Sequence, residues 1–203
     1  MNCTTVVSAT FYKIVTRSNG GAISHSAPGA LIVSDCLFDE VSTADGNRGG
    51  AAYCQTGPCS VEKSCFRRCE RDILENDDGG NCIYALQSVF DAKQISVTLC
   101  APEKDVVGDC PIIVKRDIQS NVLGSNFSKN YGNREHGDAF GEFFATGESV
   151  AQECIVESCK AHRFIFFRNG TVKNCNVLNN RFVYLIYDVY LLTNCFFYGN
   201  EEY

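Results

Sequence analysis

The stretch that decides the fold runs Gly49-Gly50-Ala51-Ala52-Tyr53 and continues, after a short gap, as Cys59-Ser60-Val61-Glu62-Lys63-Ser64-Cys65-Phe66. It has an upstream counterpart in Gly20-Gly21-Ala22-Ile23 and a downstream one in Gly79-Gly80-Asn81-Cys82-Ile83. The first glycines of the three pairs lie 29 and 30 residues apart. A repeat of this length, made of short apolar runs and turn residues, is typical of a solenoid.

A second recurring feature is an apolar residue followed four places later by cysteine. Val61 and Cys65 define this frame, and Val150 and Cys154 repeat it. We align a column of seven residues with the frame: Cys36, Cys65, Cys100, Asn126, Cys154, Cys175 and Cys195. We expect the column to stack inside the solenoid, where thiols behave as small apolar groups and an asparagine can bond to the backbone of a neighbouring turn.

Short β-prone runs are frequent along the chain, and no window carries the 3.6-residue apolar period of a long helix. The sequence therefore predicts an all-β fold, a parallel β-helix of about seven turns, each hydrogen-bonded to the next. We expect one domain over 1–203, with an opening turn in 1–19, long turns with loop insertions in 20–163, and short aromatic-rich turns in 164–203. The predicted insertions are 42–48, 71–78, 101–109 and 131–138.

Composition narrows the range of partners and compartments. The formal net charge is −6 and no run of basic residues reverses it, so we expect no nucleic-acid partner. No apolar segment has the length of a membrane span, and the N-terminus lacks the basic region and apolar core of a signal peptide. The prediction is a cytoplasmic protein without direct membrane insertion, or a cell-surface protein if the chain is a fragment of a longer secreted one.

The chain has 13 cysteines, an odd number that argues against a full set of disulfides. We expect most of them to be free thiols in a reducing compartment. Four of them, Cys54, Cys59, Cys65 and Cys69, fall within 16 residues but at spacings wider than the paired Cys-x2-Cys of zinc sites. We therefore predict no metal site and no cofactor.

An active site of the pectate lyase or polygalacturonase kind would need several carboxylates on one face of adjacent turns. The residues that could supply it are Asp105, Asp109, Lys115, Arg116, Asp117, Glu135, His136 and Asp138. We interpret them as loop charges that solvate an apolar rod, because the complete motif set of polygalacturonases is missing from the sequence. The prediction is that the protein has no catalytic residues and is not an enzyme.

Paired Gly-Gly-Ala and Phe-x-x-Asn motifs occur together in this chain, at Gly20–Ile23, Gly49–Ala52, Phe127–Asn130 and Phe197–Asn200. In this respect the chain resembles the polymorphic membrane protein (Pmp) type of repeat, found in chlamydial autotransporters and in trichomonads. The resemblance covers most of residues 9–200. It implies a right-handed parallel β-helix and, where the family has an assigned function, adhesion to host cells.

Our leading functional prediction is a non-enzymatic structural or protein-binding β-helix module that belongs to a larger intracellular assembly or scaffold. The alternatives are a surface adhesin-like passenger fragment and a polysaccharide-active β-helix enzyme of the pectate lyase type. The predicted contact region is the aromatic C-terminal end, Phe196, Phe197 and Tyr198, where an uncovered strand edge can pair with another protein or with a second copy.

Overall fold

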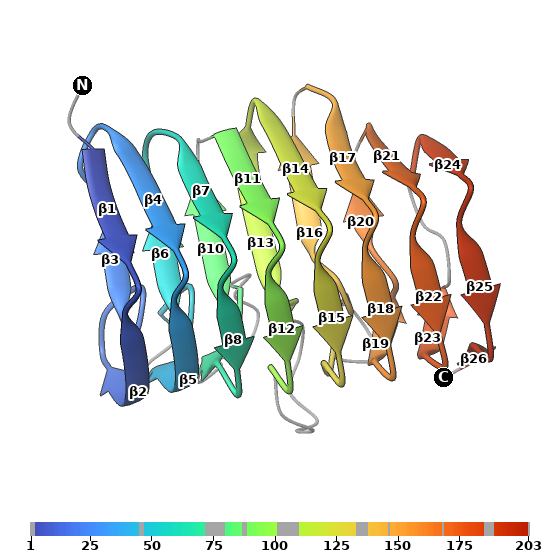
Figure 1. Cartoon of the computed structure of the whole chain (residues 1–203), viewed down its shortest axis with the longest axis horizontal. Helices are drawn as coiled ribbons and strands as arrows, with labels where there is room; N and C mark the ends of the chain where they lie inside the picture. Colours follow the sequence, from blue (N-terminus) through green and yellow to red (C-terminus); the bar gives the residue numbers. More distant parts are fainter. Residues whose placement is uncertain are drawn as a thin grey trace.

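The chain folds as a parallel β-helix, a rod in which successive turns of the backbone stack on one another (Figure 1). The structure is a computed structural model that describes residues 3–44, 47–71, 80–86, 89–100, 110–132, 138–145, 147–167, 169–184 and 189–202. Its regular elements in these ranges are all strands, and the paired strands are parallel. The predicted fold class, an all-β parallel β-helix, is confirmed.

Face A is a sheet of eight strands that follows the rod from one end to the other. In stacking order its strands are β1 (Cys3–Val7), β4 (Ala30–Ser34), β7 (Cys59–Glu62), β11 (Val89–Lys93), β14 (Gln119–Leu123), β17 (Ser149–Gln152), β21 (Gly170–Lys173) and β24 (Leu191–Thr193). Each strand of face A leads directly into a strand of face B in the same turn.

Face B also stacks eight strands along the rod. They are β2 (Thr10–Thr16), β5 (Leu37–Thr43), β8 (Cys65–Arg67), β12 (Ser96–Thr98), β15 (Asn126–Ser128), β18 (Ile155–Glu157), β22 (Asn176–Leu178) and β25 (Phe196–Tyr198). The short strand β9 (Glu70–Arg71) pairs with the far end of β5.

Two smaller sheets complete the turns. Face C contains β3 (Ile23–His25), β6 (Ala52–Cys54), β10 (Ile83–Leu86), β13 (Ile112–Asp117), β16 (Glu142–Ala145) and β20 (Phe166–Phe167). A three-stranded sheet in the last turns contains β19 (Lys160–Arg163), β23 (Arg181–Tyr184) and β26 (Glu201–Glu202). Residues 45–46, 72–78, 101–109 and 133–137, which belong to the predicted insertions, lie outside the described residues.

The number of turns differs from the prediction of about seven, because faces A and B each stack eight strands. The predicted column begins at Cys36, in the second turn, and so does not count the opening turn that we predict for residues 1–19. The structure places β1 and β2 in that segment and pairs them in register with β4 and β5. Ala9 occupies the position that Cys36 holds in the next turn, and alanine gave no cysteine to align.

Two sharp bends shape every turn, one between faces A and B and one within or just after the strand of face B. At each bend one residue has a positive φ near 50°, as at Asp35 (53°) and Glu40 (55°). This left-handed conformation bends the chain and interrupts the strand alternation. The residue after it turns inward, as Cys36 does after Asp35, while the residue before it lies on the outer side, as Glu157 does before Ser158. In this conformation are Ser8, Asp35, Lys63, Gln94, Gly124, Glu153, Asn174 and Asn194 at the first bend, and Lys13, Glu40, Arg68, Leu99, Lys129, Ser158, Asn179 and Gly199 at the second.

The Phe-x-x-Asn motif encodes the second bend. In one copy Phe127 is buried, Lys129 takes the positive φ, and Asn130 turns back into the interior. Asn130 Oδ1 accepts a hydrogen bond of 3.1 Å from the N–H of Cys100 in the preceding turn, and its Nδ2 donates one of 3.0 Å to the carbonyl of Val97. The asparagine therefore satisfies two backbone groups that the bend would otherwise bury without partners.

The interior of the rod is filled by the inward residues of the faces. On face B they stack directly, since Phe11 lies 4.9 Å from Phe38 and Phe38 lies 4.6 Å from Phe66, measured between ring centroids. Further along the rod this column continues as Val97, Phe127, Val156, Val177 and Phe197. Burial of such side chains provides about 1.5–3 kcal/mol each relative to exposure, and this is the main stabilising contribution to the solenoid.

Glycine is required at the corner that leads into face C, where the backbones of successive turns approach closely. A Cβ atom on Gly21 would lie 2.1 Å from the carbonyl oxygen of Gly50. The preceding glycines, Gly20 and Gly49, have φ of +69° and +66°, a region that side chains rarely adopt. The Gly-Gly pairs are therefore explained by backbone packing and by turn conformation.

The third pair needs a correction of one residue. Ile83 pairs with Ala52, so Gly80 is the structural equivalent of Gly49. Gly79, which we aligned with Gly49 by sequence, lies outside the described residues. The copies in the two turns are therefore 31 residues apart, as the numbering of Gly49 and Gly80 gives.

The predicted column of seven also needs correction, because its members occupy three different positions. Strand pairing places Cys65 opposite Leu37 and Ser96, on the outward side of face B, and Asn126 follows it there as an exposed residue. Cys100 lies at the second bend, opposite Asn130. The inward position at the first bend is held by Ala9, Cys36, Ser64, Ile95, Ser125, Cys154, Cys175 and Cys195.

The error has a simple cause. The true frame is apolar-x-x-Cys, as in Val172 to Cys175, with the positive-φ residue in third place. Successive side chains of a strand point to opposite sides, so an error of one residue turns an inward prediction into an outward position. The four correctly placed cysteines, Cys36, Cys154, Cys175 and Cys195, each donate a hydrogen bond from Sγ to the carbonyl two residues earlier.

Candidate functional site

The most prominent exposed feature is aromatic and lies on the last turn of face B. Phe196 and Tyr198 are 57% and 64% exposed, and their rings stack with centroids 6.3 Å apart and planes 5° apart. Both belong to β25, at the red end of the rod (Figure 1). Successive side chains of a strand point to opposite sides, so Phe196 and Tyr198 both point outward on the same side of the sheet.

Phe197, the third residue of the predicted contact region, points the other way. It is partly buried and packs against the core, with its ring 6.4 Å from that of Phe164 at 88°. In the stack of face B it follows Val177, which is fully buried. The side chain of Phe197 therefore supports the last turn, and the outward-facing side chains of this strand are Phe196 and Tyr198.

Apolar residues of the preceding turns extend this surface. Ile155 is 39% exposed and stands in the same outward column as Phe196, separated from it by Asn176. Leu178 is half-buried and lies next to Tyr198 in the register. We call this set of residues the aromatic patch: Ile155, Leu178, Phe196 and Tyr198. Other exposed apolar residues of the last two turns are Tyr184, Tyr190 and Leu191.

The strands of the last turn have a backbone edge beside the patch. Within the described part of the chain, β24, β25 and β26 each pair on one side only, with β21, β22 and β23. A parallel edge of this kind offers N–H and C=O groups to an added strand. The exposed rings and the edge therefore form one continuous surface.

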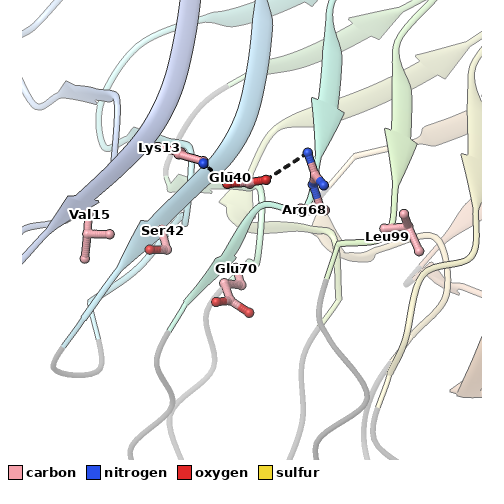
Figure 2. A pocket seen from close by; sticks show the side chains of 7 residues that line it. All are labelled: Lys13, Val15, Glu40, Ser42, Arg68, Glu70 and Leu99. Atoms are coloured by element: carbon pink, nitrogen blue, oxygen red, sulfur yellow. Dashed lines mark ion pairs between the residues drawn. The ribbon is translucent and has the colours of Figure 1, made fainter.

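A second surface feature is a charged groove near the other end of the rod (Figure 2). Lys13, Glu40 and Arg68 hold the positive-φ position of the second bend in three consecutive turns, so their side chains follow one another on the outside. Glu40 pairs with Lys13 (Oε2 to Nζ, 3.8 Å) and with Arg68 (Oε1 to Nη2, 2.9 Å). The groove has a volume of about 440 Å³ and is completed by Val15, Ser42, Glu70 and Leu99.

Asp39 lies beside this groove as a carboxylate that two arginines hold. Arg67 donates to it from Nε at 2.9 Å, and Arg68 donates from Nη2 at 3.0 Å, while the Asp39 side chain is 5% exposed. The hydrogen bonds from Arg67, followed by those from Arg68, lower the pKa of Asp39 to about 2. Asp39 thus stays ionised over the ordinary pH range, which suits a structural ion pair and not a proton donor.

The residues considered for polysaccharide cleavage do not come together as a described site. Asp105, Asp109, Glu135 and His136 lie outside the described residues, as do the side chains of Arg116 and Asp117. Lys115, on face C, lies with its Nζ 5.4 Å from the ring centroid of Phe144.

Asp138 was interpreted as a solvating loop charge, and the structure corrects this. Its side chain is fully buried and pairs with Arg163, whose Nε donates to Oδ1 at 2.6 Å and whose Nη2 donates to Oδ2 at 3.1 Å. Cys110 Sγ lies 3.6 Å from Oδ2. The partner explains the burial, because a carboxylate in the interior needs a bonded cation.

The four clustered cysteines of the sequence occupy separate places in the fold. Cys54 and Cys59 are both buried where face C leads into face A, Cys65 is half-buried on the outer side of face B, and Cys69 is buried at the second bend. A hydrogen bond between the Cys54 and Cys59 thiols lowers the pKa of Cys54 and raises that of Cys59. As a set of four they form no ligand group in the described ranges.

A different trio of cysteines does come together, and sequence reasoning missed it. The sulfur atoms of Cys69, Cys82 and Cys100 all lie within 4.8 Å of one another, and the three residues are completely buried. Burial raises the pKa of Cys82 and of Cys100, while hydrogen bonds from Cys100 and Cys82 lower the pKa of Cys69. No local spacing reveals the trio, because its members come from two turns and two different corners.

The fold and the surface define the class of this protein as a parallel β-helix with an exposed aromatic patch on one face. Neither family models, nor curated proteins, nor solved structures gave a match to the chain. In the ranges that the structure covers, helices of the length and apolarity needed to cross a bilayer do not occur.

Proposed function

We propose that this chain is a non-enzymatic β-helix module that binds another protein through the aromatic patch. The observation that carries the proposal is the stacked pair Phe196 and Tyr198, which is more than half exposed on an otherwise regular sheet face. A partner that covers these side chains removes apolar surface from water, which favours binding by about 25 cal/mol per Å² of covered apolar surface.

The shape of the patch also supports a protein partner. Aromatic rings held by a parallel sheet lose little conformational freedom on binding, and aromatic side chains dominate the energetics of protein interfaces. The adjacent edge of β25 and β24 adds backbone donors and acceptors in a regular row. A partner strand laid along this edge would gain main-chain hydrogen bonds and contacts to the two rings at once.

The setting that we propose is a reducing compartment such as the cytoplasm, within a larger assembly. The support for it is the set of 13 cysteines, which are free thiols in the structure and are mostly buried. We also propose that the chain is related to the Pmp-type repeat proteins. The support here is that both shared motifs have a structural role, Gly-Gly at the corner into face C and Phe-x-x-Asn at the second bend.

Capture of partners with matched variants tests the proposal. The immobilised wild-type chain is incubated with an extract of its native cells, in parallel with the double variant Phe196→Ser/Tyr198→Ser. The control is Tyr12→Ser, because Tyr12 is 54% exposed and stands in the same outward column of face B, at the opposite end of the rod. We expect a retained protein that the wild type and the control share and that the double variant loses.

Two results would contradict the proposal. One is retention that the double variant keeps while circular dichroism shows an intact β fold. The other is cleavage of acidic polysaccharides by the wild-type chain, with or without calcium, which would favour the enzyme alternative. If the protein retained through the patch is a receptor of a host-cell surface, the result would support the adhesin alternative. The aromatic patch would then still be the binding site.

A further inference from the structure

Three thiols form a triangle where the second bend of the third and fourth turns meets the corner that leads into face C. Cys69, Cys82 and Cys100 are each 0% exposed, and their sulfur atoms lie within 4.8 Å of one another. Among the described histidine, cysteine, aspartate and glutamate side chains, this trio is the only group of three or more whose ligand atoms converge. The trio is thus distinct from the other buried thiols of the chain.

The three cysteines of the triangle come from two different places in the turns of the solenoid. Cys69 and Cys100 hold the same place in consecutive turns, two residues after the paired Arg67 and Thr98. Cys82 comes from the corner that leads into face C, where its carbonyl accepts a hydrogen bond of 3.0 Å from the N–H of Ala51. Its sulfur thus faces the two stacked thiols from the side.

A cysteine ladder further along the rod provides an internal comparison. Cys154, Cys175 and Cys195 stack in three consecutive turns at the first bend. Turns of a β-helix repeat about every 4.8 Å, so the outer two thiols of the ladder are separated by about 10 Å. One ion can contact neighbours in such a ladder but not all three members. The trio differs because its third sulfur closes the triangle.

We propose that Cys69, Cys82 and Cys100 form a site for one thiophilic metal ion, Cu(I), bound by three thiolates. A three-coordinate ion with metal–sulfur distances of about 2.3 Å needs sulfur atoms about 4 Å apart, which the observed triangle can provide with small adjustments. Soft thiolates suit both Cu(I) and Zn(II). Structural zinc sites are almost always four-coordinate, and the described residues offer no fourth ligand, so the triangle favours Cu(I).

Binding is an exchange of protons for metal. Each sulfur loses its thiol proton to the solvent as the metal–sulfur bond forms, and neither copper nor sulfur changes oxidation state. Since protons compete for the same sulfurs, affinity falls as the pH falls.

The experiment uses the full chain, reduced and kept without oxygen, and presents Cu(I) as its coloured complex with bathocuproine disulfonate. We expect the wild type to withdraw one equivalent of copper into a site that absorbs in the near ultraviolet, with X-ray absorption showing three sulfur ligands. The test variant is Cys82→Ala, which restores the residue type found at the equivalent positions Ala51 and Ala22. It should lower copper affinity at least about 100-fold while the β fold persists.

The matched control is Cys175→Ser, in the ladder, where Ser64 and Ser125 hold equivalent positions in other turns. This control should bind one equivalent of copper with the same affinity as the wild type. The proposal is overturned if Cys82→Ala binds copper as the wild type does, if Zn(II) binds more tightly than Cu(I), or if oxygen-free protein already contains a disulfide between Cys69 and Cys100.

Discussion

The backbone N–H of Cys159 donates a hydrogen bond of 2.8 Å to Oδ1 of Asn180, one turn further along the rod. Asn180 in turn donates from Nδ2 to the carbonyl of Val156 at 2.9 Å, and its own N–H and Nδ2 each donate to Oδ1 of Asn200 at 3.0 Å. The side-chain amides thus connect three consecutive turns at the second bend. This explains why asparagine ends the Phe-x-x-Asn motif.

Replacing Asn180 with alanine should therefore destabilise the rod. The change leaves the N–H of Cys159 and the carbonyl of Val156 buried without partners, and we expect the free energy of unfolding to fall by about 2–4 kcal/mol. The measurement is urea denaturation followed by circular dichroism. The control is Asn176→Ala on the exposed side of the same turn, which should change stability by less than about 0.5 kcal/mol. Equal effects of the two substitutions would contradict this role for Asn180.

Leu99 holds the positive-φ position of the second bend at φ 55°, a conformation that leucine adopts at a cost. Leu99→Asn should raise the free energy of unfolding by about 0.5–1 kcal/mol, because asparagine tolerates this region and the side chain is 46% exposed. The reverse change at the equivalent Asn179 (φ 53°), Asn179→Leu, should lower it. Thermal unfolding of the two variants and the wild type measures these changes. Destabilisation by Leu99→Asn would contradict the claim that the positive φ of Leu99 costs stability.

Asp39 should make the fold sensitive to acid. Its pKa is lowered from 3.8 to about 2, chiefly by the hydrogen bond from Arg67, so the native state binds the proton less readily than the unfolded state. The stabilisation is complete above about pH 4 and is lost as the pH falls through 2. Asp39→Asn should reduce stability at pH 7 and flatten the stability profile between pH 4 and pH 2. An unchanged slope for Asp39→Asn would count against the ion pair.

The pair of Asp138 and Arg163 should be essential for folding. Arg163→Met leaves a fully buried carboxylate without its bonded cation and should cost about 3–5 kcal/mol. The double change Asp138→Asn/Arg163→Met removes the charge and should recover part of this loss. Denaturant titration of the wild type, Asp138→Asn, Arg163→Met and the double variant measures the coupling, and additive effects of the two changes would show that the residues act independently.

The fold could be predicted from the sequence because its repeat is long, regular and written in residues with clear physical roles. Gly20 and Gly49 mark a corner that admits no side chain, and Phe38 and Phe66 mark the inward side of face B. Alignment by cysteine alone gave the wrong register at Cys65, because inward and outward positions differ by a single residue. A count of positive-φ bends would have corrected it, but φ is not visible in the sequence.

The candidate site was predicted in part. Aromatic composition pointed to the C-terminal strand, where two of the three predicted side chains are exposed. The period of two in strands could have shown that Phe197 points inward between Phe196 and Tyr198. The thiol trio is different in kind. The distance between Cys82 and Cys100 depends on where the corner into face C lies relative to the second bend of the next turn. The spacing of the two residues along the sequence does not determine this position.

The central claim is that the aromatic patch binds a protein partner, and hydrogen exchange tests it most directly. Exchange is measured on the chain alone and with the protein that it retains from the native extract. We predict slower exchange of the backbone amides in β24 and β25 and around Ile155 and Leu178, with no change in β2 at the opposite end of the rod. Protection confined to other faces, or none at saturating partner, would contradict the account.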